Sequence, residues 1–209
     1  MIDKFKNFQA QIVPNPLSIE VVKAEGSYIY GKNKKYLDFV AGVSVCNIGH
    51  SNKKVFRAVS KQLKKYSHVM VYGEFVQESS VNLCELLVRN LPVNLNSVYL
   101  TNSGTEAVEA ALKISKRITG RSKIVSAKNS YHGSTHGSLS VSGYESRKRA
   151  YRPLLPNIEY LEFNCDDLSV IDGNTACVIL ETIQGGAGFI TPENNFLIKV
   201  KKDVKRLEL

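Results

Sequence analysis

The sequence predicts an α/β fold, a mixed and mostly parallel sheet with helices on both faces, preceded by a small N-terminal lobe. From about residue 97 to residue 206, apolar strand-like runs alternate with helical patterns, as in a parallel sheet covered by helices. Before residue 70, short strand-like runs separated by glycine turns indicate an antiparallel meander. With 209 residues, the chain is long enough to bury a core.

The small lobe is expected to begin with an arm, because residues 1–18 are polar and contain Pro14 and Pro16. Gly26 and the segment Gly31-Lys32-Asn33 mark the turns of the meander. The expected strands are residues 20–24, 27–30 and 35–39.

Two helices are expected after a glycine-punctuated loop at residues 41–50. In the first, residues 52–66, apolar side chains recur at helical spacing opposite a row of lysines, which is typical of an amphipathic surface helix. The second covers residues 75–91 and is ended by Pro92.

The larger lobe shows the alternating pattern. Its expected strands are residues 97–100, 123–127, 159–163 and 176–181, and its expected helices are residues 105–118 and 196–206. Ala107, Ala111 and Ile114 form one apolar stripe of the first of these helices, and Gly120 follows its end.

The composition excludes several classes of protein. A hydrophobic content of 43% and a charged content of 22% are ordinary globular values and argue against disorder. The net charge of +9 lies mostly on two helix faces without interleaved aromatic residues, so a basic surface is favoured over nucleic-acid binding. Four cysteines lie far apart, which predicts reduced thiols and no metal site.

Membrane insertion and secretion are not expected. The longest apolar runs are far shorter than the roughly 20 residues that span a bilayer, and the N-terminus lacks the pattern of a secretory signal. These observations predict a cytoplasmic protein.

The first candidate site is the junction where an expected strand meets an expected helix at Ser103, Gly104 and Thr105. Helix N-termini present unpaired N–H groups and bind phosphate, and the two hydroxyls add donors. A plain N-cap explains the same residues equally well.

Two further loops follow expected strands, where α/β enzymes place ligand-binding residues. In one, Tyr131 and His132 suit stacking on a flat heterocycle, although a turn with one satisfied histidine is an alternative. In the other, Glu181 and Gln184 precede a glycine-rich stretch that could equally be a surface loop. Together the three loops fit a phosphorylated aromatic cofactor better than three separate explanations do.

The motifs in these loops resemble those of the class III pyridoxal-phosphate aminotransferases, which include acetylornithine, ornithine and ω-amino acid aminotransferases. The resemblance rests on SGTEAVEAALK at 103–113, SYHG at 130–133, ETIQG at 181–185, and YLDF, AGVSV and GH between residues 36 and 50. It runs from about residue 15 to the C-terminus.

The resemblance implies a fold-type-I pyridoxal-phosphate enzyme, with residues 1–50 in the small domain and 51–209 in an incomplete large domain. It implies that Ser103, Gly104 and Thr105 hold the phosphate of pyridoxal 5′-phosphate, and that Tyr131 stacks on its ring beside His132. Glu181 and Gln184 would line the site near the ring hydroxyl and the substrate. The implied partners are an amino acid or ω-amino substrate, a 2-oxo acid such as 2-oxoglutarate, and a second copy in a homodimer.

The departures from the family pattern concern catalysis. In this family the lysine that joins the cofactor covalently, and the aspartate that keeps the pyridine nitrogen protonated, both lie beyond the position of Glu181. No lysine of this chain matches, so we expect an N-terminal half without its catalytic residues, inactive alone. The alternative is a non-catalytic remnant or a dimerisation module.

Smaller departures lie within the matched motifs. Ser134 stands where acetylornithine-type members carry an arginine that grips the substrate carboxylate, which weakens that assignment. Thr182 and Gly186 replace the proline and the second glutamate of the third motif.

Overall fold

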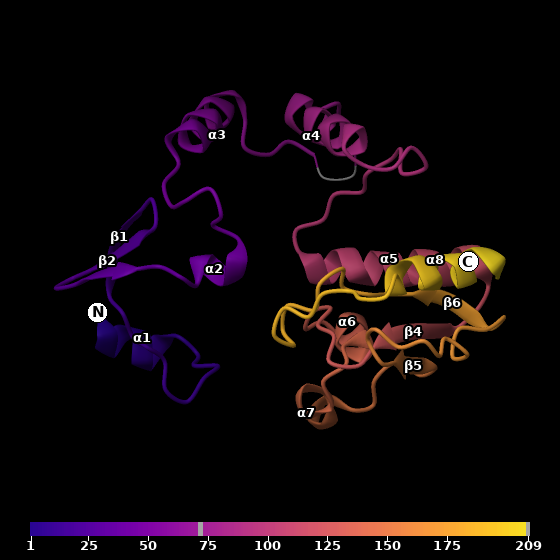
Figure 1. Ribbon diagram of the computed structural model, residues 1–209. Helices are drawn as coiled ribbons and strands as arrows, with labels where there is room; N and C mark the ends of the chain where they lie inside the picture. Colours follow the sequence, from indigo (N-terminus) through magenta and orange to yellow (C-terminus); the bar gives the residue numbers. More distant parts are fainter. Residues whose placement is uncertain (71–72, 208–209) are drawn as a thin grey trace. The chain divides into compact units, whose positions relative to one another are not determined.

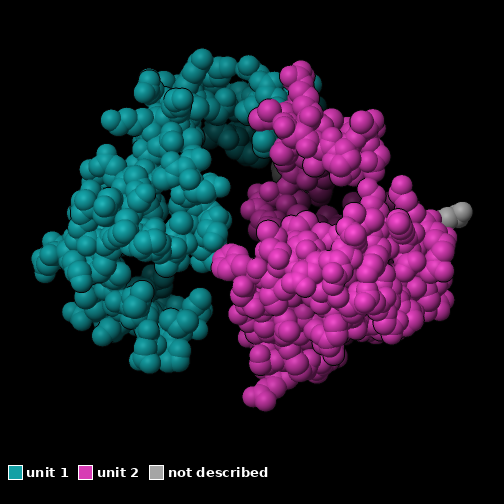
Figure 2. Space-filling model, viewed as in Figure 1, with its two compact units in different colours: residues 1–83 teal, residues 84–209 magenta. Residues whose placement is uncertain are grey.

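The computed structural model describes residues 1–70 and 73–207. The chain divides into two compact units, Met1–Leu83 and Cys84–Leu209 (Figure 2). The predicted boundary between the small domain, residues 1–50, and the large domain, residues 51–209, stays a prediction. None of the helices over the described residues has the length and apolar character needed to cross a bilayer.

Unit 1 is built around the expected meander (Figure 1). Its elements are α1 (Ile2–Phe8), β1 (Val21–Glu25), β2 (Tyr28–Gly31), β3 (Lys35–Leu37), α2 (Ala41–Ser44), α3 (Lys53–Lys65) and the first half of α4 (Glu78–Arg89). The strands pair antiparallel in the order β1-β2-β3, which confirms the meander. Three expectations need correction, because the arm contains a helix, α1, the expected loop at residues 41–50 contains the short helix α2, and α4 begins three residues later than the expected position 75.

Asp38 fixes the loop after the meander. Its Oδ1 accepts hydrogen bonds from the backbone N–H groups of Val40 and Ala41 at 3.0 and 2.9 Å, and its Oδ2 lies 2.7 Å from His50 Nε2. Hydrogen bonding to His50, followed by the bond from Ala41, lowers the pKa of Asp38. This pair joins two of the motifs that carry the family resemblance.

Unit 1 leaves its apolar side chains uncovered. None of its described residues is buried. Helix α3 begins with a regular cap, because Asn52 accepts from the N–H of Lys54, yet Phe56 is 66% exposed and Leu63 is 59% exposed. The helix is amphipathic as predicted, but no described residue of unit 1 buries its apolar face.

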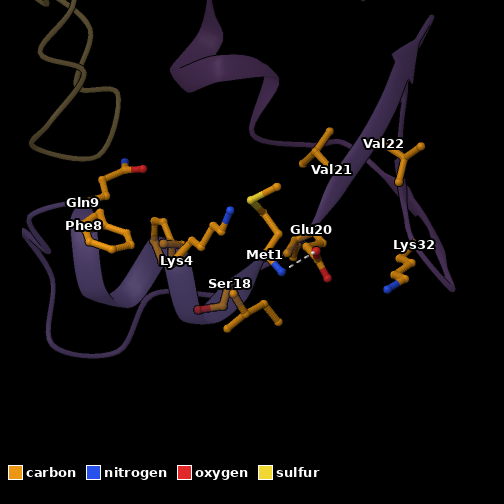
Figure 3. A pocket seen from close by; sticks show the side chains of 12 residues that line it. Met1, Lys4, Phe8, Gln9, Ser18, Glu20, Val21, Val22 and Lys32 are labelled. Carbon is orange, nitrogen blue, oxygen red and sulfur yellow. Dashed lines mark ion pairs between the residues drawn. The ribbon is translucent and has the colours of Figure 1, made fainter.

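A cavity of about 780 Å³ lies within unit 1 along α1 and the start of β1 (Figure 3). Phe8 and Val21 line it, and the N-terminal amine of Met1 lies 3.5 Å from Glu20 Oε1 at its wall. None of the predicted site residues lines this cavity.

Unit 2 is a three-layer α/β structure. Its elements are α5 (Gly104–Thr119), β4 (Lys123–Ala127), α6 (His136–Val141), α7 (Glu145–Lys148), the 3-10 helix η1 (Arg149–Tyr151), β5 (Ile158–Leu161), β6 (Thr175–Val178) and α8 (Phe196–Arg206). The sheet is parallel in the order β5-β4-β6, with β4 in the centre and all five of its residues buried.

The two faces of β4 form two parts of the core. Val125 and Ala127 pack with Phe196 and Val200 of α8, whereas Ile124 packs with Leu112 of α5 on the other face, together with Val141 of α6. The alternation follows from the two-residue period of a strand. Helices therefore cover both faces, as predicted.

Two expectations about unit 2 are wrong. Residues 97–100 form no strand, and Tyr99 there is 77% exposed, because the described chain provides no neighbouring strand to pair with them. The loop after β4, expected to be irregular, contains the short helix α6.

Candidate functional site

The N-terminus of α5 is capped by its own residues and open at Gly104. Ser103 Oγ accepts from the N–H of Glu106 at 3.3 Å, while Glu106 Oε2 accepts from the N–H of Asn102 at 2.9 Å. This reciprocal arrangement is close to a capping box. A Cβ built on Gly104 would meet nothing within 4 Å, so a ligand can approach the first helical turn there.

Thr105 joins the first candidate loop to the second. Its Oγ1 lies 2.7 Å from Thr135 Oγ1 and 2.5 Å from Ser138 Oγ, and it accepts from the N–H of Thr135 at 3.2 Å. A Cβ on Gly133 would overlap the Thr105 and Ser138 hydroxyls, and Gly133 has a φ of 133°. Glycine is therefore required where the second loop crosses α5.

Glu109 reinforces this junction, and the sequence analysis missed it. Its Oε1 accepts from Thr135 Oγ1 at 2.5 Å and from the N–H groups of Gly137 and Ser138 at 2.8 and 3.1 Å. Burial raises the pKa of Glu109, but these hydrogen bonds outweigh burial and the net pKa is lowered. The available signal was its position four residues after Thr105, on the same helix face.

Tyr131 and Glu181 join the second loop to the third. The backbone N–H of Tyr131 donates to Glu181 Oε2 at 2.9 Å, and the N–H of Gly185 donates to Glu181 Oε1 at 3.3 Å. Tyr131 itself is 43% exposed. The carboxylate thus holds the loop while the aromatic ring stays accessible.

His132 is turned into the interior of unit 2. Its Nε2 lies 3.2 Å from Ser126 Oγ on β4, and its backbone N–H donates to Ser142 Oγ at 3.0 Å. Burial lowers the pKa of His132 from 6.5 to about 4, so the ring is neutral at pH 7. Its predicted role beside the cofactor stays a prediction.

Gln184 is also interior, with 1% of its surface exposed. Its Nε2 donates to the carbonyl oxygen of Lys128 at 2.9 Å, and its backbone pairs with Ile190. The amide therefore ties the third loop to the start of the second. Its predicted place near the substrate likewise stays a prediction.

All three candidate segments therefore meet within unit 2. The second follows the carboxyl end of β4 and the third follows the neighbouring strand β6, so the topology places them at one edge of the sheet. The accessible groups are the open helix N-terminus at Gly104 and the Tyr131 ring, and beside them the exposed Ser103 hydroxyl donates to Glu106 Oε2 at 3.1 Å. This donor set fits a phosphate attached to a flat ring. Among the described residues, no cluster of His, Cys, Asp and Glu could hold a metal ion.

Comparison with known proteins identifies relatives over almost the whole chain. The family model described as aminotransferase class-III matches residues 9–207. The [LysW]-aminoadipate semialdehyde/glutamate semialdehyde transaminase of Sulfolobus acidocaldarius is 38% identical over 186 residues, which cover 88% of this chain and 48% of that protein. The acetylornithine aminotransferase of Archaeoglobus fulgidus is 36% identical over 187 residues, which cover 88% of this chain and 49% of that protein.

Solved structures show the same relationship. The adenosylmethionine-8-amino-7-oxononanoate aminotransferase of Methanocaldococcus jannaschii matches with a TM-score of 0.88 and 28% identity, covering 100% of this chain and 52% of that chain. The ornithine aminotransferase of Toxoplasma gondii shares the fold, with a TM-score of 0.87 and 23% identity, covering 99% and 51%. The chain spans about half the length of the curated relatives it matches.

Proposed function

Because the chain belongs to the class-III aminotransferases, we propose that unit 2 holds the phosphate and the ring of pyridoxal 5′-phosphate, the cofactor of that family. The single observation that carries the proposal is the joining of the three loops, through Thr105 to Thr135 and through Glu181 to the backbone of Tyr131. These contacts bring an open helix N-terminus and an exposed aromatic ring into one site.

Each residue has a distinct part in this proposal. The N–H groups at Gly104 and the hydroxyl of Ser103 bind the phosphate, and the face of Tyr131 orients the ring. The Glu181 carboxylate positions Tyr131 by accepting a hydrogen bond from the backbone N–H of Tyr131. Two other groups of residues support the loops from behind: Thr105 at the α5 junction, and His132 and Gln184 in the interior.

The proposed reaction of the whole protein is transfer of an amino group from an amino acid or ω-amino compound to a 2-oxo acid such as 2-oxoglutarate. The transaminase names of the relatives support this class. The cofactor supplies the electron sink for breaking the bond between the substrate Cα and its proton. The residues of this chain bind and orient the cofactor. The side chains that contact the substrate determine which amino donor is used.

We propose that the 209-residue polypeptide alone binds the cofactor without covalent attachment and does not turn over. Two lysines near the second loop are already engaged: Lys128 Nζ pairs with Glu162, and Lys148 Nζ donates to Tyr160 Oη at 2.7 Å. Borohydride treatment with pyridoxal 5′-phosphate should give only low labelling spread over the exposed amines, with no lysine modified stoichiometrically. A stoichiometric reduced adduct on one lysine would contradict this.

The binding proposal is tested at Gly104. Gly104→Asp has space for its side chain and places a carboxylate where the phosphate is expected. We expect the affinity for pyridoxal 5′-phosphate, measured by absorbance titration, to fall by at least about tenfold from charge repulsion. Gly173→Asp is the matched control, because its Cβ also meets open space, away from the site. Unchanged affinity in Gly104→Asp contradicts the phosphate site.

A second candidate is a non-catalytic module that associates through unit 1. The exposed apolar face of α3 favours it, with Val59 50% and Leu63 59% exposed. We expect sedimentation to show self-association that Leu63→Lys reduces. A chain that associates but never binds pyridoxal 5′-phosphate would support this function over the first. The homodimeric state and the cytoplasmic location remain predictions.

A further inference from the structure

Arg147 lies beside the candidate site, within reach of the Tyr131 ring. Around α7, Arg152 Nη2 lies 2.7 Å from Glu145 Oε1, and Lys148 Nζ lies 3.8 Å from Glu145 Oε2. Within the part of the chain that the structure describes, no carboxylate pairs with Arg147. The guanidinium of Arg147 is therefore available to an anion.

Two tyrosine rings hold this guanidinium at the site. Arg147 Cζ lies 5.5 Å from the centroid of Tyr131 and 5.2 Å from the centroid of Tyr144. Both distances fall within the range of cation–π attraction. Such contacts use the faces of the rings and leave the N–H donors of the guanidinium free for a planar oxyanion.

A second unsatisfied group lies in the same cluster. Among the described residues, the buried hydroxyl of Tyr144 has no hydrogen-bond partner. A Cβ on Gly186 would lie 3.5 Å from this hydroxyl and 3.9 Å from Tyr131 Cβ, so the third loop passes directly beside it. Leaving a buried hydroxyl unpaired is costly, and a ligand that accepts a hydrogen bond from it would remove that cost.

We propose that Arg147 and Tyr144 form a carboxylate-binding site that receives the carboxylate of the amino acid or 2-oxo acid substrate. This inference rests on the proposed function, because it assigns the substrate group that is held beside the ring of Tyr131. The guanidinium donates to the carboxylate as a fork, and the Tyr144 hydroxyl donates a further hydrogen bond. Ser134, whose Oγ lies 3.3 Å from Tyr131 Oη, offers no charge for the same task.

The test uses glutarate, a dicarboxylate without a reactive keto group, added to the 209-residue chain without cofactor. We expect NMR titration to shift the guanidinium signal of Arg147, and glutaramide, the neutral diamide, to produce no shift. Arg147→Gln should weaken glutarate binding by about tenfold or more, because it removes a charge-assisted contact. Arg147→Lys should restore part of the affinity.

Two variants separate binding from structure. Arg149→Gln removes the same charge from the next residue but one, and should leave glutarate affinity unchanged. Tyr144→Phe removes the unpartnered hydroxyl, so it should weaken glutarate binding severalfold without lowering the melting temperature. A lower melting temperature with unchanged affinity would show that Tyr144 acts only in folding.

The outcomes distinguish this inference from the function on which it rests. Absence of glutarate binding, or binding that Arg147→Gln does not weaken, overturns the site even when pyridoxal 5′-phosphate binds normally. Inorganic phosphate that displaces glutarate and binds more tightly overturns the assignment to carboxylate in favour of a phosphate site. If the chain binds glutarate but does not bind pyridoxal 5′-phosphate, the carboxylate site is supported and the proposed cofactor function is contradicted.

Discussion

Glu109 shows how one side chain can fix the relative position of two loops. Its carboxylate caps the start of α6 from a neighbouring helix, and the Cβ of any residue larger than glycine at position 137 would overlap it. The Glu109 side chain therefore fixes the path of the backbone between Tyr131 and α6.

We expect Glu109→Ala to lower the free energy of unfolding of unit 2 by about 2 kcal/mol, because charge-assisted hydrogen bonds and a helix cap are lost. Glu109→Gln keeps an acceptor oxygen and should recover part of this loss. Amide hydrogen exchange of β4 measures the effect, and Lys113→Ala, exposed on the same helix, is the control. Equal exchange in Glu109→Ala and the wild type would contradict the role.

His132 makes the stability of unit 2 depend on pH. Burial lowers the pKa of its imidazole from 6.5 to about 4, so the unfolded chain takes up a proton at a higher pH than the folded chain does. The free energy of unfolding should therefore fall as pH is lowered from 6.5 to 4, by about 2 to 3 kcal/mol from this residue.

Comparison with His132→Gln isolates this term, because carboxylates titrate alike in both proteins. The pH dependence of β4 hydrogen exchange should be shallower in the variant between pH 6.5 and 4. His136→Gln, which changes an exposed histidine in the same loop, is the control for the substitution itself. If His132→Gln and wild type have the same slope, the imidazole is not buried in solution.

At the scale of elements, the spacing of hydrophobic residues and the helix-capping residues were the basis for predicting helices and strands. Helix α5 matches its prediction because Ser103 caps it and Gly120 ends it in a left-handed conformation. Residues 97–100 look like a strand, but a strand exists only when it pairs, and pairing is not local information. In the site, the motif residues were identifiable, whereas the inward turn of His132 depends on Ser126 and Ser142, which no spacing rule connects to it.

A buried pair links α7, α6 and β5. Lys148 is 4% exposed, its Nζ donates to Tyr160 Oη, and Tyr160 Oη donates to the carbonyl of Ser140 at 2.5 Å. Burial lowers the pKa of Lys148 and raises the pKa of Tyr160 to about 12. Among the described residues, Tyr160 Oη is the one acceptor within hydrogen-bond distance of the ammonium, and Glu145 Oε2 lies 3.8 Å away.

Tyr160→Phe should therefore destabilise unit 2 by about 2 to 3 kcal/mol, since it leaves a buried charge without its acceptor. When Lys148→Met is combined with Tyr160→Phe, most of the lost free energy of unfolding should be restored, as measured by chemical denaturation. Lys128→Met, which breaks an exposed pair with Glu162, should cost less than about 1 kcal/mol. If the losses in free energy of unfolding caused by Tyr160→Phe and Lys148→Met simply add in the double variant, the two side chains are not coupled.

At the scale of the whole molecule, the two units differ in burial. All residues of β4 are buried, whereas no described residue of unit 1 is. We expect backbone amides of β2 to exchange at least about a hundredfold faster than those of β4 in the isolated chain, because local opening free energy follows buried contacts. Mass spectrometry of deuterated peptides measures the ratio. Equal protection in β2 and β4 would mean that something covers unit 1 in solution.

The strand order of unit 2 also governs how the protein is made. The central strand β4 leaves the ribosome first, but both of its partners, β5 and β6, are synthesised later, and β6 ends at Val178. The meander of unit 1, in contrast, pairs strands that follow one another directly. During translation, the hairpins of unit 1 can therefore form early, while β4 has no partner until β5 emerges and keeps one open edge until β6 follows.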